Sequence, residues 1–152
     1  MANTNAQLEA EKWIRQLALP KLFNQVFERR ALILRGGGEF DFDAVSRDGS
    51  IVVVISTSSG VTTSGRKATP KLLKIRSDVL WFYMLCNMPQ RSILVFTDDA
   101  MLQIVREQQL CGRFPPEFEL LKVELPPELA EKVKESQRLA AEEVTPIKEI
   151  SR

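Results

Sequence analysis

The chain has 152 residues, of which 44% are hydrophobic and 27% charged, and its 21 Lys and Arg residues nearly balance its 20 Asp and Glu residues. This composition is typical of a globular domain that buries its own core, and a net charge of +1 excludes a polycation that binds nucleic acid over its whole surface. Because the chain has no histidine, histidine zinc sites, Ser-His triads and histidine acid–base catalysis are also excluded.

The sequence gives no sign of a membrane segment or of a bound organic cofactor. No apolar run approaches the roughly 18–20 residues that cross a bilayer, and residues 1–13 are polar and lack the pattern of a signal peptide. We therefore expect a cytoplasmic protein without membrane contact and without a nicotinamide, flavin or haem cofactor. Cys86 and Cys111 have no metal-site spacing, and Cys86 lies in an apolar stretch that predicts a helix, so we expect it to be a reduced thiol in the core.

The first part of the chain predicts a helix followed by a short strand. Apolar residues recur at helical spacing over residues 7–30, and Pro20 marks a break or a fresh helix start. Residues 31–34 predict a strand, and three glycines at 36–38 predict a flexible turn.

A β-hairpin is predicted next. The acids Glu39, Asp41 and Asp43 alternate with apolar residues, which places all three on one face of a strand. Residues 47–50 contain an Asp-Gly pair, a strong hairpin signal. Residues 51–55 are apolar without alternation, so they predict a central strand that is covered on both faces.

The remainder of the chain predicts a long loop, two helix–strand pairs and a final helix. The expected ranges are 56–69 for the loop, 70–87 and 99–109 for the helices, 91–97 and 118–125 for the strands, and 127–144 for the final helix. In the first of these helices a core stripe is expected at Leu72, Ile75, Val79, Phe82 and Cys86.

A glycine-led strand bearing Asp, a turn, and an apolar strand ending in small polar residues resemble the core of the PD-(D/E)xK nuclease superfamily. The resemblance covers roughly residues 7–125. It implies a restriction-endonuclease-like fold, an α/β arrangement with an α-β-β-β-α-β core, a mixed central sheet and a C-terminal helix. We accordingly expect a nuclease-like domain over residues 1–125 and a helical extension over residues 126–152.

The resemblance also implies a metal site for phosphodiester cleavage. The aspartate of the family's first strand matches Asp43 best and Asp41 second, and Asp43 is expected beside the C-terminal end of the 51–55 strand. A further carboxylate is expected from Glu28, at the end of the first predicted helix. These acids would hold Mg²⁺ weakly, because the family's Glu-x-Lys tripeptide falls on Ile55 to Thr57, where both the acid and the lysine are absent.

The missing Glu and Lys should remove several kcal/mol of transition-state stabilisation. We therefore expect a nuclease-fold protein that does not cleave and instead binds nucleic acid or a protein partner. One alternative is an active Mg²⁺-dependent nuclease with a rearranged site, in which Asp43 acts with a migrated lysine, Lys67 or Lys71. Another is a structural or oligomeric interaction module.

A basic segment suggests where nucleic acid would bind. No acid occurs between Gly49 and Ser77. The cations expected to contact phosphates are Arg66, Lys67, Lys71 and Lys74, with hydroxyl groups of Thr62, Thr63 and Ser64 nearby. The competing interpretation is an ordinary solvated helix face.

The final predicted helix suggests a homodimer. Its apolar positions, Leu129, Val133, Ala140 and Val144, form a narrow stripe among charged residues. A stripe this narrow predicts a helix–helix contact with a second copy, in which flanking charges set the register.

Overall fold

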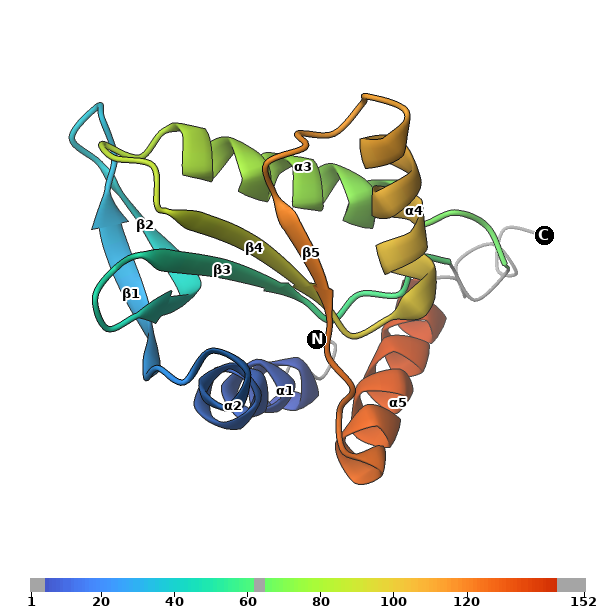
Figure 1. Cartoon of the computed structure of the whole chain (residues 1–152). Coiled ribbons are helices and arrows are strands. Elements are labelled where there is room, and N and C mark those ends of the chain that lie inside the picture. The colour runs from blue at the N-terminus through green and yellow to red at the C-terminus, as the bar shows by residue number, and fades with distance from the viewer. Residues whose placement is uncertain (1–4, 62–64, 145–152) are drawn as a thin grey trace.

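A computed structural model describes residues 5–61 and 65–144. A five-stranded mixed sheet crosses the molecule, and its spatial order β1-β2-β3-β4-β5 follows the chain (Figure 1). β1 to β3 are antiparallel neighbours, whereas β3, β4 and β5 run parallel. The strands span Phe27–Ile33 (β1), Glu39–Ser46 (β2), Ile51–Ser56 (β3), Arg91–Phe96 (β4) and Glu119–Lys122 (β5).

Helices cover both faces of the sheet (Figure 1). They span Asn5–Trp13 (α1), a π-helical turn at Ile14–Ala18 (η1), Leu19–Phe23 (α2), Thr69–Tyr83 (α3), Asp99–Leu110 (α4) and Pro127–Val144 (α5). One core cluster joins the sheet to α3 and α4, and a second joins its other face to η1 and α2. The expected α/β class and mixed sheet are confirmed.

The central strands form where the sequence is most apolar. Every residue from Ile51 to Ile55 is buried, and so is every residue from Ser92 to Phe96. The parallel pair that they form is connected through α3, whose predicted stripe is buried at Leu72, Ile75, Val79 and Phe82. In the preceding hairpin, Gly49 takes a φ of 77°, which an L side chain rarely adopts, as the predicted Asp-Gly turn requires.

The helix predicted over residues 7–30 is wrong from residue 24 onward. Helix α2 ends at Phe23, and Asn24 follows with a φ of 55°, a left-handed C-cap. β1 then begins at Phe27, earlier than the strand predicted from residue 31. The apolar spacing around Phe27 fits either state, and pairing with β2 decides it in favour of a strand.

The prediction that Cys86 is a core thiol is also wrong. Helix α3 ends at Tyr83, before the last position of the expected stripe. Leu85 is buried in its place and bridges Leu34 after β1, whereas Cys86 and Cys111 are exposed free cysteines. Once the helix has ended, helical spacing no longer determines which side chain faces the core.

Helix α5 packs against α1 of its own chain. Leu129 and Val133 are buried in one cluster with Ala6 and Ala10, whose small side chains let the helices approach closely. Polar contacts flank this cluster, from Lys132 Nζ to Glu9 Oε2 at 3.5 Å and from Ser136 Oγ to Gln7 Oε1 at 3.3 Å.

The homodimer was predicted from an apolar stripe on α5 that would contact a second copy, and this reason is wrong. Leu129 and Val133, expected to contact a second copy, are used inside one chain because α1 presents a matching apolar face. The side chain of Val144 lies outside the described residues. The homodimer itself stays a prediction. Among the residues that the structure describes, no helix is both long enough and apolar enough to cross a membrane.

Candidate functional site

The site is built around an irregularity in β2. Along β1 the paired positions Glu28 and Arg30 are two residues apart, whereas their partners Val45 and Phe42 are three apart. β2 therefore contains one extra residue, a β-bulge, in the segment that holds Asp43. Bulges bend a strand and re-aim its side chains, and they are enriched next to active sites.

At the bulge, a hydrogen bond to the Asp43 side chain replaces the backbone hydrogen bonds that pair β2 with β3. The last regular pair between β2 and β3 joins Ala44 to Val53. Beyond it, Asp43 Oδ2 accepts a hydrogen bond from the Ile55 N–H at 2.8 Å, and Arg15 Nη1 donates to the Asp43 carbonyl oxygen at 2.9 Å. Asp43 thus lies beside the C-terminal end of β3, where the sequence placed it.

Glu11 of α1 is the second carboxylate of this region. Burial, followed by the negative charge of Asp43, raises the pKa of Glu11 to about 7, against the opposing charges of Arg29, Arg15 and Lys74. Among the described residues, no hydrogen bond or ion pair reaches the Glu11 carboxylate. Burial also raises the pKa of Asp43, although the Ile55 N–H and the same three cations act against this shift.

A cavity of about 460 Å³ opens between the start of β2 and α3. Its lining is mainly charged and consists of Arg29, Ala31, Glu39, Phe40, Asp41, Asp43, Lys74 and Asp78. Its lining contains two ion pairs, Arg29 Nε to Asp41 Oδ2 at 3.6 Å between β1 and β2, and Lys74 Nζ to Asp78 Oδ2 at 3.2 Å along α3. Four carboxylates against two cations leave the lining acidic.

The structure brings together some of the predicted site residues. Asp41, Asp43 and Lys74 line the cavity, but Lys67 and Lys71 are exposed and do not. Arg66 is exposed as well. Their contacts with phosphate stay predictions, and Thr62, Thr63 and Ser64 lie outside the described residues.

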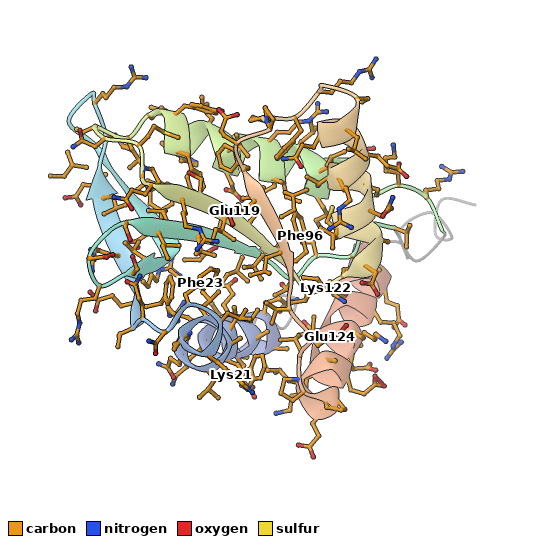
Figure 2. The ribbon with its side chains drawn as sticks, viewed as in Figure 1. Lys21, Phe23, Phe96, Glu119, Lys122 and Glu124 are labelled. Atoms are coloured by element: carbon orange, nitrogen blue, oxygen red, sulfur yellow. The ribbon has the colours of Figure 1, made fainter. Side chains whose placement is uncertain are left out.

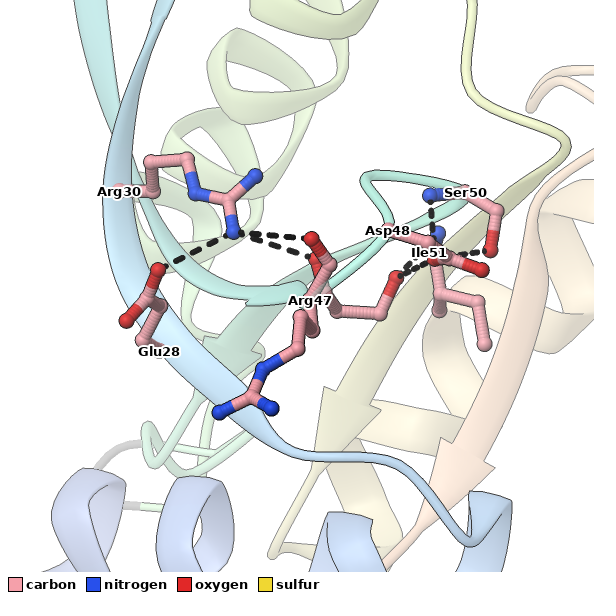
Figure 3. A network of polar contacts seen from close by, with 7 residues as sticks. Glu28, Arg30, Arg47, Asp48, Ser50 and Ile51 are labelled. Carbon is pink, nitrogen blue, oxygen red and sulfur yellow. Dashed lines mark hydrogen bonds and ion pairs between the residues drawn. The ribbon is translucent and has the colours of Figure 1, made fainter.

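The expected position of Glu28 is wrong. Because α2 ends before it, Glu28 lies on β1 and not at the end of a helix, and its Oε1 accepts from Arg30 Nη2 at 3.1 Å (Figure 3). The same Arg30 nitrogen donates to the carbonyl oxygens of Ser46 and Arg47 at 3.4 Å. Glu28 thus belongs to a polar network beside the hairpin turn, and it does not line the cavity.

Glu11 was missed by the sequence reasoning, although one signal could have found it. Ala6 and Ala10 of α1 and Ile14 of η1 are buried at a spacing of four. Glu11 directly follows one of them, so its carboxylate is placed at the border of the buried face. An acid in that position is costly unless it has a partner or a function.

The positions of the family's Glu-x-Lys are occupied by neutral, buried residues. Ile55 is 6% exposed and packs in the cluster beneath the N-terminal helices. Thr57 is 9% exposed, and its carbonyl oxygen accepts a hydrogen bond from Gln137 Nε2 of α5 at 2.6 Å. Neither position supplies a carboxylate or an ammonium group.

The residues around Asp43 do not fit the divalent cation that the family resemblance implies. No three Asp, Glu, Cys or His side chains within residues 5–61 and 65–144 form a group that could hold a metal ion. Asp43 Oδ2 already accepts from Ile55. The positive charges of Arg15, Arg29 and Lys74, which act on both Glu11 and Asp43, would also oppose a further cation.

The opposite edge of the sheet, at β5, has a different charge pattern. Glu119, Lys122 and Glu124 project along this edge in Figure 2. Both oxygens of Glu119 accept from Arg91, at 2.7 and 2.9 Å, and Arg91 also lies over the ring of Phe23. Lys122 donates to Glu124 at 2.9 Å. Charged side chains on a short edge strand discourage pairing with another sheet, so this pattern has a structural explanation.

Comparison with protein-family models gives no match, and comparisons with curated proteins and with solved structures give no significant match either.

Proposed function

We propose that the chain is a nuclease-fold protein with a degenerate site, which binds nucleic acid along the exposed face of α3 that holds Lys71 and Lys74 and does not cleave it. One observation carries this proposal. Asp43 lies at a bulge beside the end of β3, where the PD-(D/E)xK resemblance expects a metal-binding aspartate, whereas Ile55 and Thr57 stand in the places of the glutamate and the lysine.

The strand arrangement supports the nuclease-fold part of the proposal. Three antiparallel strands follow the N-terminal helices, and a helix then connects β3 to the parallel strand β4. This succession is the α-β-β-β-α-β order that the resemblance implies. Helix α5 is an addition that packs on α1.

The charges of the cavity argue against cleavage. A phosphodiester that approaches Asp43 without a metal ion meets Asp41, Asp78 and Glu39 in the same cavity. Repulsion between like charges a few ångströms apart costs several kcal/mol where solvent is partly excluded. The bound metal that would screen this repulsion in a nuclease finds no fitting set of ligands here.

The exposed lysines of α3, Lys71 and Lys74, are better placed to contact phosphates than the acids of the cavity are. Lys71 and Lys74 are three residues apart on α3 and therefore share one helix face. Both are exposed, and Lys74 also lines the cavity. A nucleic-acid backbone that follows this face would contact the rim of the cavity and leave the acids beneath it untouched.

Salt-dependent binding tests the proposed interface. Duplex DNA should bind at low salt, and the combined Lys71→Ala and Lys74→Ala substitutions should lower the slope of log K against log salt by about two, since each neutralised phosphate contributes about 0.9. Lys134→Ala, at an exposed position on α5, is the matched control and should leave the slope unchanged. Binding that is absent at low salt, or indifferent to both lysines, would refute the interface.

A cleavage assay tests the degenerate site. With Mg²⁺ or Mn²⁺ present, single- and double-stranded DNA and RNA should stay intact. Turnover that is abolished by Asp43→Asn would instead establish an active nuclease with a rearranged site. The asparagine variant keeps an oxygen acceptor for the Ile55 N–H, so loss of turnover could not be attributed to loss of that hydrogen bond.

A further inference from the structure

We propose that Asp78 is a positioning residue that holds the Lys74 ammonium group at the mouth of the Asp43 cavity. The ion pair itself is direct, with Lys74 Nζ at 3.2 Å from Asp78 Oδ2. The consequence for nucleic-acid binding rests on the proposed function, whereas the positioning of Lys74 is independent of it.

Asp78 lies on the core side of its helix. It is 8% exposed and follows the buried residues Leu72 and Ile75 on α3, next to the fully apolar Val79. Placing a carboxylate there is costly, and an apolar side chain of similar volume is often the more stable choice at a buried ion-pair position. Stability alone therefore does not explain an aspartate at this position.

Helix stabilisation does not explain the pair either. Lys74 precedes Asp78 by four residues, and the more favourable order for such a pair places the acid toward the N-terminus of the helix. The Lys74 side chain is 72% exposed, so the pair joins a solvent-exposed ammonium group to a buried carboxylate. Such a pair contributes little to folding, but it fixes a long side chain in one orientation.

That orientation is defined by what surrounds the cavity. Lys74 shares the cavity with charged groups of β1 and β2, namely Arg29, Glu39, Asp41 and Asp43, and its charge also acts on Glu11 of α1. Lys74 and Asp43 line the same cavity, and the Lys74 charge lowers the pKa of both Asp43 and Glu11. Without Asp78, four rotatable bonds would let the ammonium group move into solvent.

A direct test measures Lys74 in the protein alone. The side-chain ¹⁵N signal of its ammonium group should indicate restricted motion in the native protein and become averaged by motion in Asp78→Asn. Lys71 on the same helix is the internal control and should give the same signal in both proteins. A Lys74 signal that does not change in Asp78→Asn, in a variant that melts as cooperatively as the native protein, would overturn the proposal.

A double-mutant cycle on DNA binding provides the functional test. If Asp78 positions Lys74, Asp78→Asn should weaken binding of a short duplex about threefold in the native background. The same substitution should tighten binding in a Lys74→Gln background, where only repulsion between Asp78 and phosphate is left to remove. Equal tightening in both backgrounds would overturn positioning. If no protein binds DNA, the proposed function fails, and the ¹⁵N measurement alone decides the role of Asp78.

Discussion

Two aspartates of the hairpin, Asp43 and Asp48, lie five residues apart in opposite environments. Asp48 is exposed in the turn, where its Oδ1 accepts from the Ser46 hydroxyl, the Ser50 N–H and the Ser50 hydroxyl (Figure 3). These hydrogen bonds lower the pKa of Asp48, those from Ser50 contributing most. Asp43, at the bulge, has one hydrogen bond to its carboxylate, and burial raises its pKa.

The difference separates a structural acid from a candidate functional one. A carboxylate with a lowered pKa stabilises the folded chain above its ordinary titration range, and this contribution is lost as the pH falls. A carboxylate with a raised pKa does the opposite, because ionisation costs more in the folded protein than in the unfolded chain. The turn end of the hairpin thus favours folding, while the cavity end reduces stability at neutral pH, as functional sites often do.

The largest effect is expected from Ser46→Ala at the turn end. Ser46 is fully buried, and its hydroxyl accepts from the Ile51 N–H at 3.0 Å while donating to Asp48. Alanine leaves that N–H without an acceptor, which should lower the free energy of unfolding by about 2–3 kcal/mol. Chemical denaturation measures the change. Ser50→Ala, at the rim of the same turn, is the control and should cost less. Equal losses would mean that the turn has no buried anchor.

Glu11→Gln, at the α1 acid whose pKa the charge of Asp43 helps to raise, should have the opposite sign. A pKa raised from 4.5 to about 7 corresponds to a few kcal/mol in full. The partial exposure of Glu11 reduces this gain to about 1–2 kcal/mol of added stability at pH 8.

The pH dependence of that gain follows from the sign of the shift. Below pH 4.5 the carboxyl is protonated in the folded and the unfolded chain, so glutamine should confer no advantage there. The advantage should appear as the pH rises from 4.5 through about 7, where the native protein has to ionise Glu11. Glu131→Gln, exposed on α5, is the control and should leave the free energy of unfolding at pH 8 nearly unchanged. A gain from Glu11→Gln that does not vary with pH would contradict the comparison.

Gly49→Ala tests how much the backbone conformation of the turn contributes to stability. The φ of 77° at Gly49 is strained for an L side chain, so alanine should cost about 1 kcal/mol, visible as a lower melting temperature. Gly38→Ala is a matched control, because nothing lies within 4 Å of its added Cβ and its φ is not in the left-handed region. A larger loss at Gly38 would show that this difference in backbone conformation is unimportant.

Arg29→Gln should have the smallest effect. Its ion pair with Asp41 spans 3.6 Å, and the two side chains are 48% and 56% exposed. Exposed pairs of this kind contribute less than about 0.5 kcal/mol, so thermal unfolding at moderate salt should hardly change. A loss above 1 kcal/mol would mean that the pair acts as part of a stabilising network, and the cavity end would then no longer differ from the turn.

The sequence was most informative where one physical factor dominates. The Asp-Gly turn and the apolar β3 follow from turn chemistry and strand periodicity, and the structure confirms them. The position of Asp43 beside the end of β3 was expected from the family resemblance, and the structure places Asp43 there. The prediction that Glu28 lies at the end of a helix was wrong because the apolar spacing before Phe27 is compatible with both helix and strand. Glu11 was missed because the spacing of Ala6, Ala10 and Ile14 places it only at the border of a buried face, while the strand against which that face packs is not encoded in any local pattern.

Lys74 illustrates the same limit on another element. The sequence placed it with Lys67 and Lys71 on a basic segment, and nothing local distinguished the three. The cavity does so, because only Lys74 of these lysines lines it. Conversely, Leu129 and Val133 of the stripe predicted on α5 are buried as expected, but their partner was not predicted, since Ala6 and Ala10 are too small to predict a docking face by themselves.

The pairing of α1 with α5 also bears on the order of folding events. Glu9 and Lys132 are separated by 123 positions, and every strand of the sheet is synthesised between the two helices that they join. On the ribosome, the alanine face of α1 therefore stays uncovered until the last helix emerges, at roughly 5–20 residues per second. A nascent chain stalled before Pro127 would leave Ala6 and Ala10 uncovered and the Thr57 carbonyl oxygen without its Gln137 partner, and such a fragment should be a preferred substrate for chaperones and proteases.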